Sequence, residues 1–200
     1  MGQDNLHVCM DLPQDDEVKL QNRILKPQSW EMGTQALLVS ARIREVMQMC
    51  DRENPIYEQI SSFSIALYAI GYVDCKDLMS FQDIEQHEAA AILHEDFTPA
   101  AFDDIPLDYI ITESQDNYLI VIGDPMFPVH FAVITSRRGA KPYFSKMPFF
   151  GSGFDSLGEL KSELDGTDGV ADGEIHCFRE LRPVPPPPSS MGKIYIVKEH

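Results

Sequence analysis

The segment from Tyr118 to Lys146 constrains the fold of this chain more than any other. Tyr118–Gly123 is apolar at both alternating sets of positions, and its β-branched residues favour a strand that is covered on both faces. Asp124-Pro125 interrupts the run, because proline lacks a backbone donor and biases its neighbour toward a turn. Val129–Thr135 then resumes the two-sided apolar pattern. Because connections this short join antiparallel strands, the segment predicts the centre of an antiparallel sheet.

Neighbouring segments extend this predicted sheet. Asp108–Glu113 is a candidate strand before the central pair, and Glu174–Glu180 is a candidate strand after it. Lys141–Lys146 reads as extended, and Pro142 places it at an edge of the sheet, because proline cannot donate to a neighbouring strand. The sheet therefore has three to five predicted strands.

Apolar residues at helical spacing and capping signals predict helices before and after these strands in the sequence. The predicted helices cover Thr34–Cys50, Pro55–Ile70, about Phe81–Glu95, and a short segment that starts after Ser156. Together the elements predict an α+β fold, in which an antiparallel β-meander packs against N-terminal helices.

The chain divides into four predicted regions. Residues 1–30 form a poorly structured N-terminal segment, and residues 31–182 form a single α+β domain. Residues 183–191 contain the run PVPPPP, which predicts a polyproline linker. Residues 192–200 contain an alternating strand pattern that either completes the domain's own sheet or adds to a partner's sheet. One candidate function is therefore a structural subunit joined to an assembly through this C-terminal strand.

The charge distribution predicts a basic partner. The formal net charge is −16, and no Lys or Arg occurs from Asp77 to Ser136, where the chain carries twelve acids. Such a surface disfavours direct binding to nucleic acid or anionic membranes, since both require cations. We expect instead a non-enzymatic binding or regulatory protein that engages a basic protein surface. Its predicted partner-binding residues are Asp83, Glu85, Glu88, Glu95, Asp96, Asp103, Asp104 and Asp108.

A stronger form of this expectation is a nucleic-acid mimic. Carboxylates on a rigid scaffold can imitate the spacing of phosphates, because duplex DNA carries about one charge per 1.7 Å of axis. The protein would then inhibit a nucleic-acid-binding protein by occupying its binding groove. A solvated acidic face that only keeps the protein in solution is the simpler explanation of the same residues.

The remaining sequence signals predict a cytoplasmic protein without a cofactor. No apolar run is long enough to span a membrane, and the N-terminus shows no secretory pattern. The four cysteines are isolated from one another, so we expect reduced thiols. The glycine-rich motifs that bind nucleotides are absent from the sequence. Oligomeric state is left open by these signals.

One pair of side chains has the spacing of metal ligands. Asp83 and His87 are one turn apart on the third predicted helix, so both could contact one ion. His94 is two turns further along and too distant to join them directly. Two ligands do not complete a metal site, and we predict none.

The alternative hypothesis is that the protein is an enzyme, a hydrolase. The stretch HFAVITS, which contains His130, resembles the histidine-bearing strand of papain-like cysteine peptidases, and SSFSIALYAIGY is similar to the helix that follows their nucleophile. The resemblance implies His130 as base and a Cys or Ser nucleophile, with Cys50 and Cys75 as candidates. Ser61 and Ser62 occupy the positions where that family has its cysteine.

Overall fold

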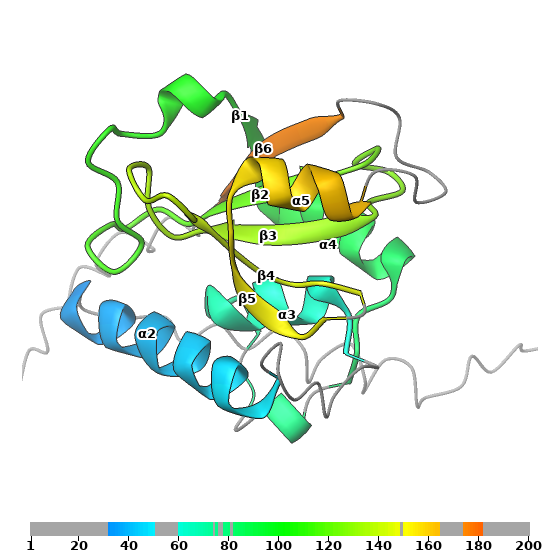
Figure 1. Ribbon diagram of the computed structural model, residues 1–200, viewed down its shortest axis with the longest axis horizontal. Coiled ribbons are helices and arrows are strands. Elements are labelled where there is room, and N and C mark those ends of the chain that lie inside the picture. Colours follow the sequence, from blue (N-terminus) through cyan, green and yellow to red (C-terminus); the bar gives the residue numbers. More distant parts are fainter. Residues whose placement is uncertain are drawn as a thin grey trace, which may run out of the picture.

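The structure is a computed structural model that describes residues 32–50, 60–73, 75, 78–80, 82–148, 150–164 and 174–181. Its centre is a six-stranded sheet in which every neighbouring pair is antiparallel, in the order β1-β6-β2-β3-β4-β5 (Figure 1). The strands are β1 (Phe97–Ala100), β2 (Tyr118–Ile122), β3 (His130–Ile134), β4 (Tyr143–Lys146), β5 (Ser152–Asp155) and β6 (Ile175–Glu180). The helices are α2 (Met32–Met49), α3 (Ser62–Ala69), α4 (Gln86–Asp96) and α5 (Leu157–Leu164), with short 3-10 turns η1 (Leu78–Ser80) and η2 (Phe102–Asp104).

The predicted α+β class is confirmed, and so is the antiparallel centre. Every residue of β2 and β3 is buried, as expected for strands covered on both faces. The predicted number of three to five strands is wrong, because the sheet has six strands within the described part of the chain. The two unpredicted strands, β1 and β5, contain Pro99 and Gly153, which are poor strand formers, and both elements are specified by backbone pairing with a neighbour.

Two details of the predicted sheet need correction. β4 is an internal strand between β3 and β5, although Pro142 suggested an edge. Pro142 precedes the strand and contributes its carbonyl oxygen to the Thr135 N–H at 2.8 Å, so its missing donor costs no ladder bond. Asp108–Glu113 is a turn-rich segment with a single bridge, Ile110 to Ser136, and not a regular strand.

The helices agree with the prediction except near their starts. α2 and α5 lie where the sequence predicts them, and α5 begins with the expected capping box between Ser156 and Glu159. The second predicted helix is described only from residue 60, and α3 begins at Ser62. α4 begins at Gln86, five residues later than predicted, because the polar groups before it are bonded to α3.

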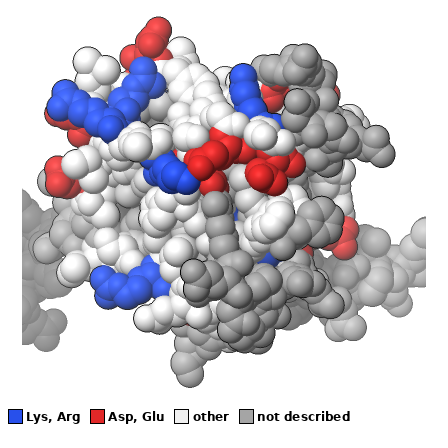
Figure 2. All heavy atoms as spheres, viewed as in Figure 1, with Lys and Arg blue, Asp and Glu red and all other residues white. Residues whose placement is uncertain are grey.

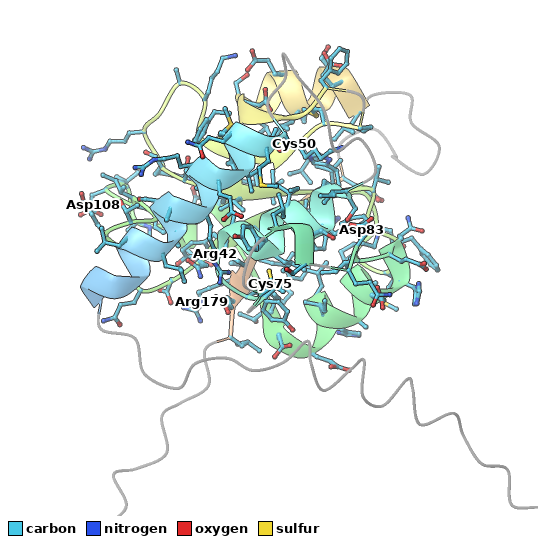
Figure 3. All side chains as sticks on the ribbon, turned by 90° about the horizontal axis from the view of Figure 1, so that it is seen from below. Arg42, Cys50, Cys75, Asp83, Asp108 and Arg179 are labelled. Carbon is cyan, nitrogen blue, oxygen red and sulfur yellow. The ribbon has the colours of Figure 1, made fainter. Side chains whose placement is uncertain are left out.

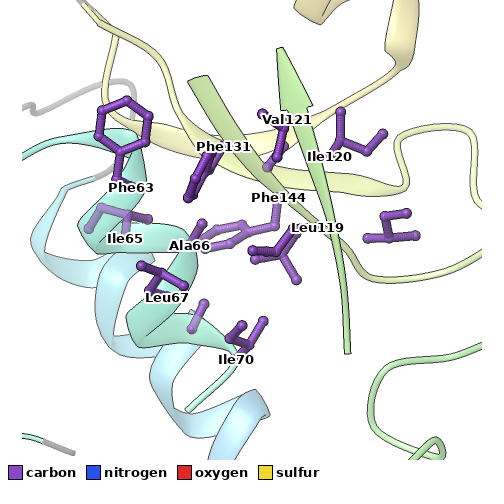
Figure 4. Packing of buried hydrophobic residues seen from close by; sticks show 14 of the residues in the cluster. Phe63, Ile65, Ala66, Leu67, Ile70, Leu119, Ile120, Val121, Phe131 and Phe144 are labelled. Atoms are coloured by element: carbon purple, nitrogen blue, oxygen red, sulfur yellow. The ribbon is translucent and has the colours of Figure 1, made fainter. Parts of the chain in front are cut away.

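The two faces of the sheet have different covers. Phe131 of β3 packs against Phe63 of α3 at a centroid distance of 4.8 Å, so α3 covers the face that carries Phe131 (Figure 4). Because successive strand residues point to opposite faces, His130 points to the other face. That second face is covered in part by the segment before β2, where Tyr109 stacks edge-on against Tyr118 at 5.1 Å.

The connections between the strands lie at two opposite ends of the sheet. In an antiparallel meander the connections alternate between ends, so the β2–β3 and β4–β5 connections share one end and the β3–β4 connection lies at the other. We call these the β2–β3 end and the β3–β4 end. α3 and α4 both begin at the β2–β3 end: the Phe131 N–H donates to Ser62 Oγ at 3.3 Å, and Gln86 Nε2 donates to the Pro128 carbonyl at 3.1 Å.

None of the described helices is long and apolar enough to cross a membrane. The predicted N-terminal segment, the polyproline linker and the C-terminal strand lie outside the described residues.

Candidate functional site

Five carboxylates gather at the β2–β3 end of the molecule. Asp83 and Glu85 precede α4, and Glu88 lies in its first turn. Asp124 begins the β2–β3 connection, and the Gly123 N–H beside it donates to the Glu174 carbonyl at the start of β6 at 3.1 Å. We call this group the acidic end; its members are Asp83, Glu85, Glu88, Asp124 and Glu174.

Asp83 has a structural role at the start of α3. Its Oδ1 accepts hydrogen bonds from the Ser61 N–H at 2.9 Å, from Ser61 Oγ at 2.8 Å and from Ser64 Oγ. Ser64 Oγ in turn accepts from the Ile84 N–H at 2.8 Å. A carboxylate near the positive end of a helix is favourable, so Asp83 fastens the segment before α4 to the start of α3.

Glu85 and Glu88 cap α4. The Glu85 N–H donates to Glu88 Oε2 at 3.0 Å, and the Ala89 N–H donates to the Glu85 carbonyl at 2.9 Å. The Glu85 carboxylate is exposed and lies 3.4 Å from Nδ1 of the equally exposed His87. Glu85 therefore keeps its charge available at the surface while its backbone completes the helix.

The other predicted partner-binding residues lie away from the acidic end. Glu95 and Asp96 are at the far end of α4, which is about 16 Å long at about 1.5 Å per residue. The Asp96 carboxylate accepts a hydrogen bond from the Tyr72 hydroxyl. Burial of Tyr72, with this hydrogen bond as the second cause, raises the pKa of its hydroxyl.

Asp103, Asp104 and Asp108 belong to the segment between β1 and β2. Asp104 Oδ2 accepts from the Ala101 N–H at 2.9 Å, and Asp103 lies 3.5 Å from the guanidinium of Arg137. Figure 3 shows Asp108 and Asp83 on opposite sides of the molecule, with Arg42 between them. The eight predicted residues therefore form no single face.

The cationic side chains of the described residues lie mainly elsewhere. Arg42 is buried, and its guanidinium donates to the carbonyls of Tyr68 at 2.9 Å and Val73 at 2.8 Å. Arg137 and Arg138 belong to the β3–β4 connection, and Lys141 beside them contacts Glu159 at 2.5 Å. Acidic and basic side chains lie side by side on the face drawn in Figure 2, so charges partly cancel there.

The acidic end differs from that face. The described segments that build it, 82–92, 123–129, 147–148, 150–151 and 174–175, contain no Lys or Arg. Lys146 precedes the β4–β5 connection, but its side chain is buried. The negative charge at the acidic end is therefore not cancelled by an exposed cation of these segments.

His130 is placed where it cannot meet Ser61 or Ser62. Its side chain is 1% exposed and points to the face of the sheet opposite α3, whereas both serines lie at the start of α3. Among the described residues, its Nε2 has no hydrogen-bond partner. Burial, with a contribution from the charge of Lys146, lowers the pKa of the imidazole to about 3. A base this weak is poorly matched to proton abstraction near neutral pH.

The cysteines are distributed over separate elements. Cys50 is buried after α2, Cys75 is half-buried after α3, and Cys177 is buried in β6. These three are in the thiol form, and the fourth cysteine, Cys9, lies outside the described residues. Burial raises the pKa of the Cys177 thiol to about 11, which keeps it protonated.

The predicted ligand pair Asp83 and His87 is also separated. Asp83 precedes α4 and is bonded to α3, so the two side chains do not share a helix face. Within the described residues, no group of three or more His, Cys, Asp or Glu side chains could hold a metal ion.

Comparisons with models of protein families, with curated proteins and with solved structures each found no match.

Proposed function

We propose that this protein is a binding protein that engages a basic surface of another protein through the acidic end. The proposal is carried by one observation, the grouping of five carboxylates on segments without an exposed Lys or Arg. Charges of one sign at one place attract a partner of opposite sign, speed its encounter and orient it. Of the eight residues predicted from the sequence, the proposed surface keeps only Asp83, Glu85 and Glu88. It also includes Asp124 and Glu174.

The nucleic-acid mimic is not part of this proposal. A mimic requires a row of carboxylates at phosphate spacing, but the predicted residues are divided between the acidic end, the far end of α4 and the segment before β2. The hydrolase alternative is disfavoured, because His130 is buried and its Nε2 bonds to no described residue, while Ser61 and Ser62 lie at the start of α3 on the other side of the sheet. The structural-subunit alternative depends on residues 192–200, which are not described.

The proposal is tested with a defined cationic probe, a peptide of alternating lysine and serine. The full-length protein, labelled with ¹⁵N, is titrated with this peptide while backbone amide signals are followed. We expect the shifts to concentrate in segments 82–92, 123–129 and 174–175, and the affinity to decrease steeply as salt rises.

Two charge reversals at different positions separate the effect of the acidic end from the effect of net charge, because both change the net charge by the same amount. Glu174→Lys changes an exposed carboxylate of the acidic end, and Asp108→Lys makes the same change of charge at an exposed position distant from it. We expect Glu174→Lys to weaken peptide binding severalfold and Asp108→Lys to weaken it much less. Equal effects of the two substitutions, or shifts spread over the whole surface, would contradict the proposal.

A further inference from the structure

Three large apolar side chains are exposed beside the acidic end. Met126 and Phe127, in the β2–β3 connection, are 54% and 67% exposed, and Phe150, in the β4–β5 connection, is 52% exposed. β3 and β4 are neighbours in the sheet, and both connections lie at the same end. Adjacent loops therefore present these side chains to solvent from one end of the molecule.

The backbone holds the β2–β3 connection in a fixed conformation. The Phe127 N–H donates to the Asp124 carbonyl at 2.7 Å, and the Met126 N–H donates to Asp124 Oδ1 at 2.9 Å. The Val129 N–H donates to the Ile122 carbonyl at 2.8 Å, which closes the turn. Because the turn is already ordered, a partner that binds it loses little free energy in fixing the loop.

Exposed aromatic and methionine side chains surrounded by charged ones are typical of binding surfaces. Buried aromatic anchors supply most of the energy of protein interfaces, and a polar rim around them excludes water. Here Asp124 adjoins the apolar side chains along the chain, and Gln86, one residue from Glu85, contacts Pro128 of the same turn. The apolar side chains therefore lie next to carboxylates and not next to an exposed cation of the same segments.

We infer that the occupant of this surface is a protein segment that combines lysine or arginine with large apolar side chains. The apolar side chains of that segment pack on Met126, Phe127 and Phe150, and its cations face Asp124, Glu85 and Glu174. Charge complementarity selects this occupant, because an anionic membrane or nucleic acid is repelled by the same carboxylates. The inference rests on the proposed function and adds apolar contacts to the ionic contacts of that function.

Two probes separate the apolar contribution from the ionic one. The first is the lysine–serine peptide, and the second is the same peptide with leucine at some serine positions, so that both carry equal charge. We expect the leucine-containing peptide to bind the full-length protein about tenfold more tightly, which is the effect of about one buried anchor.

Substitution of exposed apolar residues locates this gain. Phe127→Ser should remove most of the tenfold difference and leave the affinity for the lysine–serine peptide unchanged. Leu107→Ser is the matched control, because Leu107 is similarly exposed, at 68%, but belongs to the segment between β1 and β2. It should retain the difference. Both side chains are exposed, so neither change is expected to affect folding measurably.

The outcomes distinguish the two proposals. If the lysine–serine peptide binds through the acidic end but leucine adds nothing, or Phe127→Ser and Leu107→Ser act alike, the inference is overturned and the proposed function stands. If Glu174→Lys changes the affinity for neither peptide, both the inference and the proposed function are overturned.

Discussion

Gly123 shows how a single residue fixes the turn that presents the candidate surface. Its φ is +93°, a conformation that residues with a Cβ rarely adopt. A Cβ at this position would lie 2.9 Å from Val129 Cγ2 and 3.1 Å from the Val129 nitrogen. Both the backbone conformation and the lack of space therefore require glycine.

Gly123→Ala is expected to destabilise the protein by about 1–2 kcal/mol or more, because alanine adopts this conformation at a cost of that size and must also displace Val129. Gly139→Ala is the control, since the nearest atom to a Cβ there is 3.8 Å away and its φ is not positive. Urea unfolding measures both. Equal free energies of unfolding for the two variants would show that the turn tolerates a Cβ.

His130 provides a prediction about pH. In the unfolded chain its pKa is near 6.5, whereas in the folded protein burial lowers the pKa to about 3. Between these values the unfolded state binds the additional proton, so stability is complete above pH 6.5 and decreases as pH falls toward 3.

His130→Met removes the titrating imidazole. Between about pH 3 and pH 6.5, the slope of unfolding free energy against pH should therefore decrease by up to about 1.4 kcal/mol per pH unit. Leu107→Ser, which changes an exposed side chain that carries no titratable group, is the control and should leave the slope unchanged. The measurement is urea unfolding at a series of pH values. Parallel curves for the wild type and His130→Met would contradict the assigned burial.

At the scale of elements, Asp83 joins two helices that are consecutive in the chain. Asp83→Ala removes the acceptor for Ser61 and Ser64 at the start of α3, and we expect a loss of about 1–2 kcal/mol, as for other helix caps. Asp108→Ala is the control and should change stability by no more than about 0.5 kcal/mol. Thermal and urea unfolding report the difference, and similar values for both variants would mean that the cap is not formed.

The elements also show which parts of the fold follow from local sequence. β2, β3, α2 and α5 could be predicted, because apolar periodicity and capping residues act within a few positions. β1 and β5 could not be predicted, because their pairing partners, β6 and β4, specify them more strongly than Pro99 or Gly153 opposes them. The late start of α4 follows from contacts between Asp83 and α3 that no local pattern contains.

The candidate site was predicted in part. Asp83, Glu85 and Glu88 belong to the acidic end, but the length of α4 carries Glu95 and Asp96 away from them. Glu174 is distant in sequence and joins the group because β6 pairs with β2. The alternation of connections along a meander is a signal that could have grouped Met126, Phe127 and Phe150 before the structure was known.

At the scale of the whole molecule, net charge opposes compactness. The chain carries a formal charge of −16, and folding brings these charges closer together. Raising ionic strength from about 0.01 M to about 0.1 M shortens the screening length from about 30 Å to about 10 Å. We therefore expect the melting temperature to rise over this range, equally in NaCl and KCl. A melting temperature that is unchanged, or that falls, would indicate that the carboxylates are balanced by cations within the fold.

The order of the strands has a consequence for synthesis. β6 lies between β1 and β2, so Ile175–Glu180 fills a gap that all earlier strands leave open. While the ribosome is still making residues before 175, β1 and one side of β2 have no pairing partner, and their backbone groups remain exposed. Completion of the sheet thus depends on the last of these six strands to emerge, and the nascent chain is vulnerable to aggregation until then.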